Sequence, residues 1–203
     1  RVAVGALCQQ FLAALGIELA SHVLALGAIR AKPAAATVAK NIVSLGGGAT
    51  VVGTIGDDEA GATLSQCLTN LEKVTAYTVA DTGRVTTRKT RIVADHSHQV
   101  LRIDNESSED VDEDVAARLL ARVKECIKDC HVLVLSDYTK GVLSERVVKV
   151  AIQEAFAAGV PIVANPKPKS AVRYKGSSVV SLNRTEASEL LGHEVFSGPS
   201  AEA

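Results

Sequence analysis

Apolar and polar positions along the chain alternate in blocks that predict helices and strands in turn. An Ala-rich stretch over residues 34–44 favours a helix, and a β-like run at 49–55 follows it after three glycines. Leucines spaced three and four residues apart predict a second helix over 58–72, whose acidic first turn complements the helix dipole. Helices that feed strands in this way indicate an α/β fold.

The second half of the chain repeats this order more regularly. Its predicted strands are short unbroken apolar runs, which are typical of a parallel sheet covered by helices. An acidic connector over 105–114, expected to be solvated surface, leads into a helix that ends near residue 130. The elements expected after it are a strand at 131–135, a helix at 144–158, strands at 160–164 and 178–182, and a helix from 183 to 191.

Two amphipathic runs between residues 86 and 104 flank a polar turn and predict an antiparallel β-hairpin. Strand alternation places Lys89 and Arg91 on one face, and Arg102 and Asp104 share a face on the returning strand. This polar face would hold a charged ligand or a partner sheet, or it is simply a solvated edge. The pattern alone favours neither interpretation.

Composition narrows the class of protein. A chain of 203 residues with 47% hydrophobic content predicts one domain over 1–203. A net charge of −1 argues against nucleic acid or a membrane as partner, and four scattered cysteines favour a reducing cytoplasm. Glu18 and His22 interrupt the apolar stretch over 12–31, so residues 1–32 are expected to be helical rather than membrane-spanning.

Polar residues follow three of the predicted strands, at Asp137, at Asn165 and Lys167, and at Asn183 and Glu186. Ligands of open α/β sheets bind where parallel strands end, so we expect these clusters to share one crevice. Phosphoryl transfer needs a metal ion, donors for the phosphates and a general base. Glu186 would hold Mg²⁺ through water while the helix amino end faces phosphate.

Purely structural roles explain two of these clusters as well. The spacing of Asn183 and Glu186 fits a capping box at the start of a helix, which spacing alone favours over a ligand site. Asp137 followed by Gly141 fits a turn with an Asp cap and a Gly finish. Both alternatives remain open from the residues themselves.

Three segments follow one another along the chain: the hairpin, Leu-Ser-Asp-Tyr-Thr-Lys-Gly over 135–141, and Asn-Arg-Thr-Glu over 183–186. In this order they resemble the ribokinase-like (PfkB) sugar kinases, most closely their heptose 7-phosphate kinase branch, and the similarity covers residues 33–195. The resemblance implies a truncated ribokinase-like three-layer sandwich with a mainly parallel sheet and a β-hairpin lid. It also implies ATP and Mg²⁺ as cofactors, a sugar or sugar phosphate as substrate (heptose 7-phosphate favoured), and a homodimer formed through the lid hairpin.

The resemblance carries over to site residues position by position. The implied nucleotide-binding residues are Lys167, Asn183, Arg184, Thr185 and Glu186, with Glu186 also the water-mediated magnesium ligand. The implied substrate-binding residues are Thr37, Asn41, Lys89, Arg102, Asp104, Asp137 and Lys140.

The sequence also departs from the family's pattern. The Gly-Gly-Ala-Ala-Asn helix start appears as Pro-Ala-Ala-Ala-Thr over 33–37, and Asn165 stands where the family has Asp. The Gly-Ala-Gly-Asp motif that supplies the catalytic Asp and the anion hole is absent from the chain, so no catalytic residue is assigned. The expectation is a sugar kinase domain that is incomplete or inactive as this chain; the alternative is a non-catalytic binding or oligomerisation module.

Overall fold

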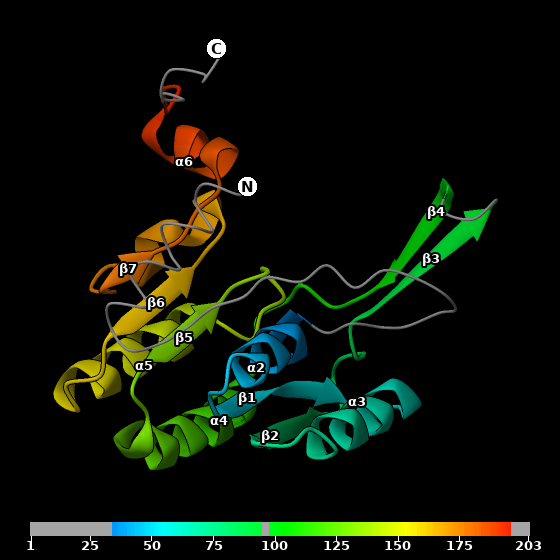
Figure 1. Ribbon diagram of the computed structural model, residues 1–203, viewed down its shortest axis with the longest axis horizontal. Coiled ribbons are helices and arrows are strands. Elements are labelled where there is room, and N and C mark those ends of the chain that lie inside the picture. Colours follow the sequence, from blue (N-terminus) through cyan, green and yellow to red (C-terminus); the bar gives the residue numbers. More distant parts are fainter. Residues whose placement is uncertain (1–33, 95–97, 196–203) are drawn as a thin grey trace.

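The computed structural model describes residues 34–94 and 98–195. Figure 1 shows helices against two groups of strands, and a two-stranded arm that projects from them. The helices are α2 (Ala34–Ser44), α3 (Glu59–Thr69), α4 (Glu113–Cys126), η2 (Ile127–Asp129), α5 (Glu145–Ala157), η3 (Pro168–Tyr174) and α6 (Arg184–Leu191). The strands are β1 (Ala49–Gly56), β2 (Val74–Asp81), β3 (Arg88–Ala94), β4 (His98–Asn105), β5 (Leu133–Ser136), β6 (Ile162–Asn165) and β7 (Val179–Val180).

Parallel pairing dominates the sheets, which confirms the predicted α/β class. β1 pairs with β2 in parallel over eight residues, and β5, β6 and β7 form a second parallel sheet in that order. The polar segments that follow β5, β6 and β7 therefore lie at one edge, as predicted. β2 was not predicted, because Thr75 and Thr78 interrupt its apolar residues and leave no long apolar run.

Two apolar clusters form the core of the part of the chain that the structure describes. One joins α5 to β5, β6 and η3, with Tyr174 and Val148 fully buried in it. The other joins the inner face of α4 to β2 and α5, and Leu143 packs against both clusters. Both helices are amphipathic and have Asp or Ser N-caps, Asp112 for α4 and Ser144 for α5, as the sequence pattern indicated.

The hairpin of β3 and β4 is antiparallel, which confirms that prediction. Lys89 lies opposite Asp104 and Arg91 opposite Arg102, so these four positions share one face, and the register shifts between Ile92 and Val93. Figure 1 shows the hairpin extending away from both sheets.

One carboxylate fixes the base of the hairpin to the rest of the fold. Asp58 caps α3 by accepting a hydrogen bond from the Gly61 N–H (2.7 Å), and its other oxygen accepts one from the Thr86 N–H (2.8 Å). The buried Thr86 hydroxyl accepts in turn from the Gly56 N–H (2.8 Å). These bonds, led by the one from Thr86, lower the pKa of Asp58, so the anchor is ionised at neutral pH.

The predictions made for residues 1–32 lie outside the described residues. Across the parts of the chain that the structure does describe, no helix has the length and apolar character needed to span a membrane.

Candidate active site at the carboxyl edge of the second sheet

The ends of β5, β6 and β7 are tied together by backbone and side-chain hydrogen bonds. The Asp137 N–H donates to the Asn165 carbonyl (3.0 Å), and the Asn165 side-chain amide donates to the Ser181 carbonyl (2.6 Å). A carboxylate has no proton to donate at neutral pH, so the second bond requires Asn at this position. The residue that departs from the family's pattern therefore has a structural role in joining β6 to the segment after β7.

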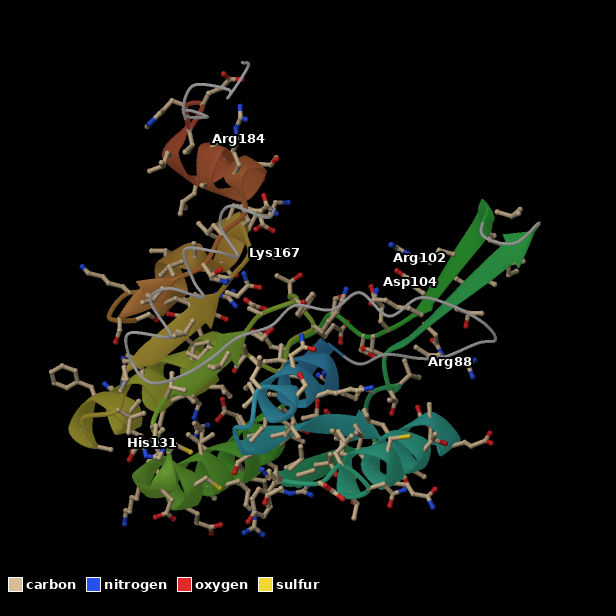
Figure 2. All side chains as sticks on the ribbon, in the orientation of Figure 1. Arg88, Arg102, Asp104, His131, Lys167 and Arg184 are labelled. Atoms are coloured by element: carbon tan, nitrogen blue, oxygen red, sulfur yellow. The ribbon has the colours of Figure 1, made fainter. Side chains whose placement is uncertain are left out.

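Lys167 and Glu186 meet across this edge. The Lys167 ammonium lies 2.7 Å from one Glu186 oxygen and 5.9 Å from the centre of the Tyr138 ring. Lys167 follows β6, Glu186 is in the first turn of α6 and Tyr138 follows β5, so one lysine joins all three strand ends. Figure 2 shows Lys167 at the side of the sheet from which α6 begins, with Arg184 farther out.

The start of α6 is a capping box. The Asn183 side chain accepts from the Glu186 N–H (2.9 Å), and the Glu186 carboxylate accepts from the Asn183 N–H (3.0 Å). The structural alternative raised by the spacing is thus confirmed. The hydrogen bond from Lys167, and after it the one from Asn183, lowers the pKa of Glu186, so its carboxylate is ionised at neutral pH.

The capping box leaves free the backbone N–H groups and carboxylate lone pairs that a magnesium nucleotide would use. Arg184 and Thr185 are exposed, and their N–H groups, at the first two positions of α6, have no acceptor among the described residues. Each Glu186 oxygen accepts one bond and keeps a free lone pair for a metal-bound water. The described ranges contain no group of three His, Cys, Asp or Glu side chains suited to a metal ion. A single carboxylate with free lone pairs beside the exposed first turn of α6 fits a magnesium ion brought by phosphate groups.

Asp137 is buried, with 5% of its surface exposed. One carboxylate oxygen accepts from the Thr139 N–H (2.6 Å) and the other from the Ser170 hydroxyl (2.7 Å). Thr139 takes a positive φ of 54°, which turns the chain toward Lys140. Tyr174 lies beneath the carboxylate, and burial together with the neighbouring Asp137 charge raises the pKa of its phenol. This geometry favours a positioning role for Asp137, while its predicted contact with substrate stays a prediction.

Four of the predicted substrate-binding residues gather with Glu106 at the base of the hairpin. We call this group, Lys89, Arg102, Asp104, Glu106 and Lys140, the lysine cluster. The Lys89 ammonium lies 3.0 Å from Asp104 and 2.9 Å from Glu106, and Lys140 lies 2.5 Å from the other Glu106 oxygen. Arg102 lies 3.0 Å from the same Asp104 oxygen, and the second Asp104 oxygen is buried without a hydrogen-bond partner among the described residues. Figure 2 shows Arg102 and Asp104 side by side where β4 leaves the arm.

The charges in the lysine cluster stabilise one another. Lys140, and after it Lys89, lowers the pKa of Glu106, and Lys89 lowers that of Asp104. Glu106 and Asp104 raise the pKa of Lys89. Lys89, Asp104 and Glu106 are therefore charged at neutral pH.

Arg84 connects the segments next to the lysine cluster by three hydrogen bonds. Its guanidinium donates to the Asp81 carboxylate (2.8 Å), the Lys140 carbonyl (3.0 Å) and the Glu109 carbonyl (3.0 Å). Gly141, with a φ of +76°, lies directly against Glu109, where a β-carbon would overlap the backbone. The turn after β5 is thus fixed against the connector that follows β4.

Thr37 and Asn41, the other two predicted substrate residues, lie on α2, which packs against β1. In the described ranges no hydrogen bond or ion pair joins the Asn41 side chain to the lysine cluster or to the strand ends. The assignment of both residues to substrate binding stays a prediction.

Sequence reasoning missed Glu106, Arg84 and Ser170. Glu106 belongs to the acidic connector expected to be solvated surface; for this residue the expectation was wrong, since only 20% of its side chain is exposed and two lysines flank it. Its position two residues after Asp104 on an alternating strand was the signal that could have placed it on the same face.

Comparison with known proteins agrees with this architecture. The model of the pfkB family of carbohydrate kinases matches residues 34–202. The chain is 40% identical over 158 residues to the bifunctional protein HldE of Caulobacter sp. (strain K31), and 38% identical over 163 residues to that of Paramagnetospirillum magneticum. These alignments cover 78% and 80% of this chain but only 32% and 33% of those proteins, so the chain spans about a third of their length.

Solved structures share the fold at lower identity. The tetrameric inhibited form of phosphofructokinase-2 from Escherichia coli superposes with a TM-score of 0.64 at 20% identity, covering 87% of this chain and 60% of that one. A carbohydrate kinase from Agrobacterium tumefaciens gives a TM-score of 0.59 at 21% identity, covering 77% and 51%. The chain therefore belongs to the pfkB family of carbohydrate kinases, and the predicted ribokinase-like fold is confirmed.

Proposed function

We propose that this chain is part of a sugar kinase domain that binds magnesium ATP at the α6 end of the sheet edge and a phosphorylated sugar at the lysine cluster. The observation that carries the proposal is the convergence of three strand ends on one lysine–glutamate pair, Lys167 and Glu186, beside the exposed first turn of α6. Phosphate binding at a helix amino end next to a carboxylate that orders Mg²⁺ needs no further group.

Heptose 7-phosphate is the favoured substrate. Support comes from the similarity to HldE proteins and from the lysine cluster, whose net positive charge suits an anionic sugar better than a neutral one. The unpartnered Asp104 oxygen is an acceptor for a sugar hydroxyl. A cytoplasmic location and a single domain over 1–203 remain predictions.

Phosphoryl transfer by this chain alone is not part of the proposal. The sequence has no Gly-Ala-Gly-Asp motif, and with it lacks the base and the amide cradle that transfer requires. Nucleotide binding needs neither group. We therefore assign binding of both ligands to the chain and catalysis to a domain that also contains the missing motif.

A homodimer formed through the hairpin is a second part of the proposal. The face of the hairpin opposite the lysines presents Ile92, Leu101 and Ile103, each about half exposed, to solvent. Apolar side chains paired across two strands are a suitable surface for a second hairpin of the same kind. A non-catalytic module that only oligomerises through this face is the alternative.

Calorimetric titration with magnesium ATP tests the nucleotide site. The wild-type chain is expected to bind weakly, and Glu186→Gln should weaken binding about 5- to 10-fold because it removes the metal-ordering charge. Glu189→Gln, an exposed change on the same helix, is the matched control and should bind as the wild type does. Equal affinity of the Glu186→Gln and wild-type chains would reject this site.

A further inference from the structure

Glu106 bridges two elements of the lysine cluster that lie far apart in the sequence. One of its oxygens meets Lys89 on β3 and the other meets Lys140 on the turn after β5, 34 positions farther along the chain. No carboxylate other than Glu106 contacts Lys140 among the described residues. Glu106 therefore supplies the carboxylate that lies between the two ammonium groups.

The cluster keeps an excess of positive charge even with Glu106 in place. Lys89, Lys140 and Arg102 face only two carboxylates, Asp104 and Glu106, so the net charge is +1. Both lysine side chains are about 30% exposed and can be reached from solvent. A dianionic ligand would be attracted by three cationic groups. It would compete with the Glu106 carboxylate for the two lysines.

The Glu106 side chain is also positioned so that it can rotate away from the two lysines. It is the first residue after β4 and belongs to neither a helix nor a strand, whereas Asp104 is held within the β4 ladder opposite Lys89. A side-chain rotation at Glu106 breaks two ion pairs and no backbone hydrogen bond of the hairpin. Partly exposed ion pairs of this kind contribute little to stability, so a ligand phosphate can displace them.

We infer that Glu106 is a specificity-determining residue: it occupies the position between Lys89 and Lys140 that the phosphate group of a sugar phosphate takes on binding, and it excludes weaker anions and neutral sugars from it. The inference deepens the proposed function, on which it rests, by naming the residue that sets the threshold for ligand charge. A carboxylate carries one negative charge and a phosphate monoester nearly two at neutral pH, so the phosphate competes successfully while chloride and carboxylates do not.

The test compares affinities in variants of the whole chain. Fructose 6-phosphate, inorganic phosphate and ADP are titrated calorimetrically at constant ionic strength into the wild type, Glu106→Gln and Lys140→Met. Glu106→Gln should bind fructose 6-phosphate and inorganic phosphate about 5- to 10-fold more tightly, and Lys140→Met at least about 5-fold more weakly. Glu125→Gln removes a carboxylate paired with Arg122 (2.6 Å) on α4 and is the matched control, expected to match the wild type.

A residue with a merely structural role would not gain affinity when its charge is removed. Unchanged or weaker binding of fructose 6-phosphate to Glu106→Gln would overturn the inference, as would a gain confined to ADP. Thermal unfolding of each variant shows that it is folded, and the opposite expected signs of the Glu106 and Lys140 changes keep the test decisive if one variant is unstable. The ADP titrations of the wild type report on the nucleotide site independently. A failure of the proposed nucleotide site would therefore be distinguished from a failure of the inference about Glu106.

Discussion

The Lys167 ammonium and the Glu186 carboxylate lie 2.7 Å apart, although one follows β6 and the other begins α6. Their contact joins the segment after β6 to the start of α6. It leaves the N–H groups at the first two positions of α6 without an acceptor among the described residues. The same carboxylate completes the capping box with Asn183, so one side chain both stabilises the helix start and carries the charge that a metal ion needs.

Replacing Lys167 should raise the pKa of Glu186. In the wild type that pKa is lowered, chiefly by Lys167, so the ion pair stabilises the fold at pH values above the ordinary glutamate pKa of about 4.3 and is lost as the pH falls through the lowered value. Lys167→Met removes the larger cause and leaves the Asn183 N–H. Carbon-detected NMR titration of the Glu186 carboxyl group measures the shift.

Lys175→Met is the control for this change, because Lys175 is exposed and makes no ion pair among the described residues. It should leave the Glu186 titration where it is in the wild type. An identical titration curve in Lys167→Met would mean that the ion pair does not persist in solution.

Gly141→Ala should destabilise the chain by about 2 kcal/mol or more, because a β-carbon would overlap the Glu109 backbone at a residue with a φ of +76°. Gly159→Ala is the matched control: its φ is +70°, but no atom lies within 4 Å of the added carbon. That change should cost only about 1 kcal/mol. Urea denaturation of both variants measures the difference, and equal losses would contradict the close approach of the turn after β5 to the connector.

Leu101→Glu should convert the expected dimer to a monomer, because it places a charge in the apolar face of the hairpin opposite Ile92. Val172→Glu changes a residue that is 80% exposed on η3 and should leave the dimer intact. Light scattering coupled to size-exclusion chromatography determines the mass of each. A wild-type chain that is strictly monomeric at all concentrations would remove the dimer from the proposal.

Periodicity predicted much of this fold because it reports directly on burial. The apolar runs before Asp137 and Asn165 form parallel strands, as expected, and the alternation around Lys89 and Asp104 predicted the correct hairpin face. Both the strands and the hairpin face can be read from the order of apolar and polar residues within a single segment.

Contacts between distant segments were not predictable in the same way. Glu106 lies in the same acidic connector as the exposed acids that follow it, and alternation after Asp104 indicates only its face. Its contact with Lys140, 34 residues away, could not be read from the local pattern. Asp137 was expected to face a crevice, but Ser170, 33 residues later, covers its carboxylate. No periodicity encodes which of several similar side chains will find a partner from another element.

The central claim is that the chain binds both ligands of a sugar kinase but does not transfer phosphate by itself. The most direct measurement is ADP release from magnesium ATP by the purified chain, with and without heptose 7-phosphate. Because the base and the oxyanion donors are absent from the sequence, and loss of one such donor typically costs about 10²- to 10³-fold, ADP release should stay at background with or without the sugar. Release that depends on the sugar and disappears in Glu186→Ala would contradict the claim.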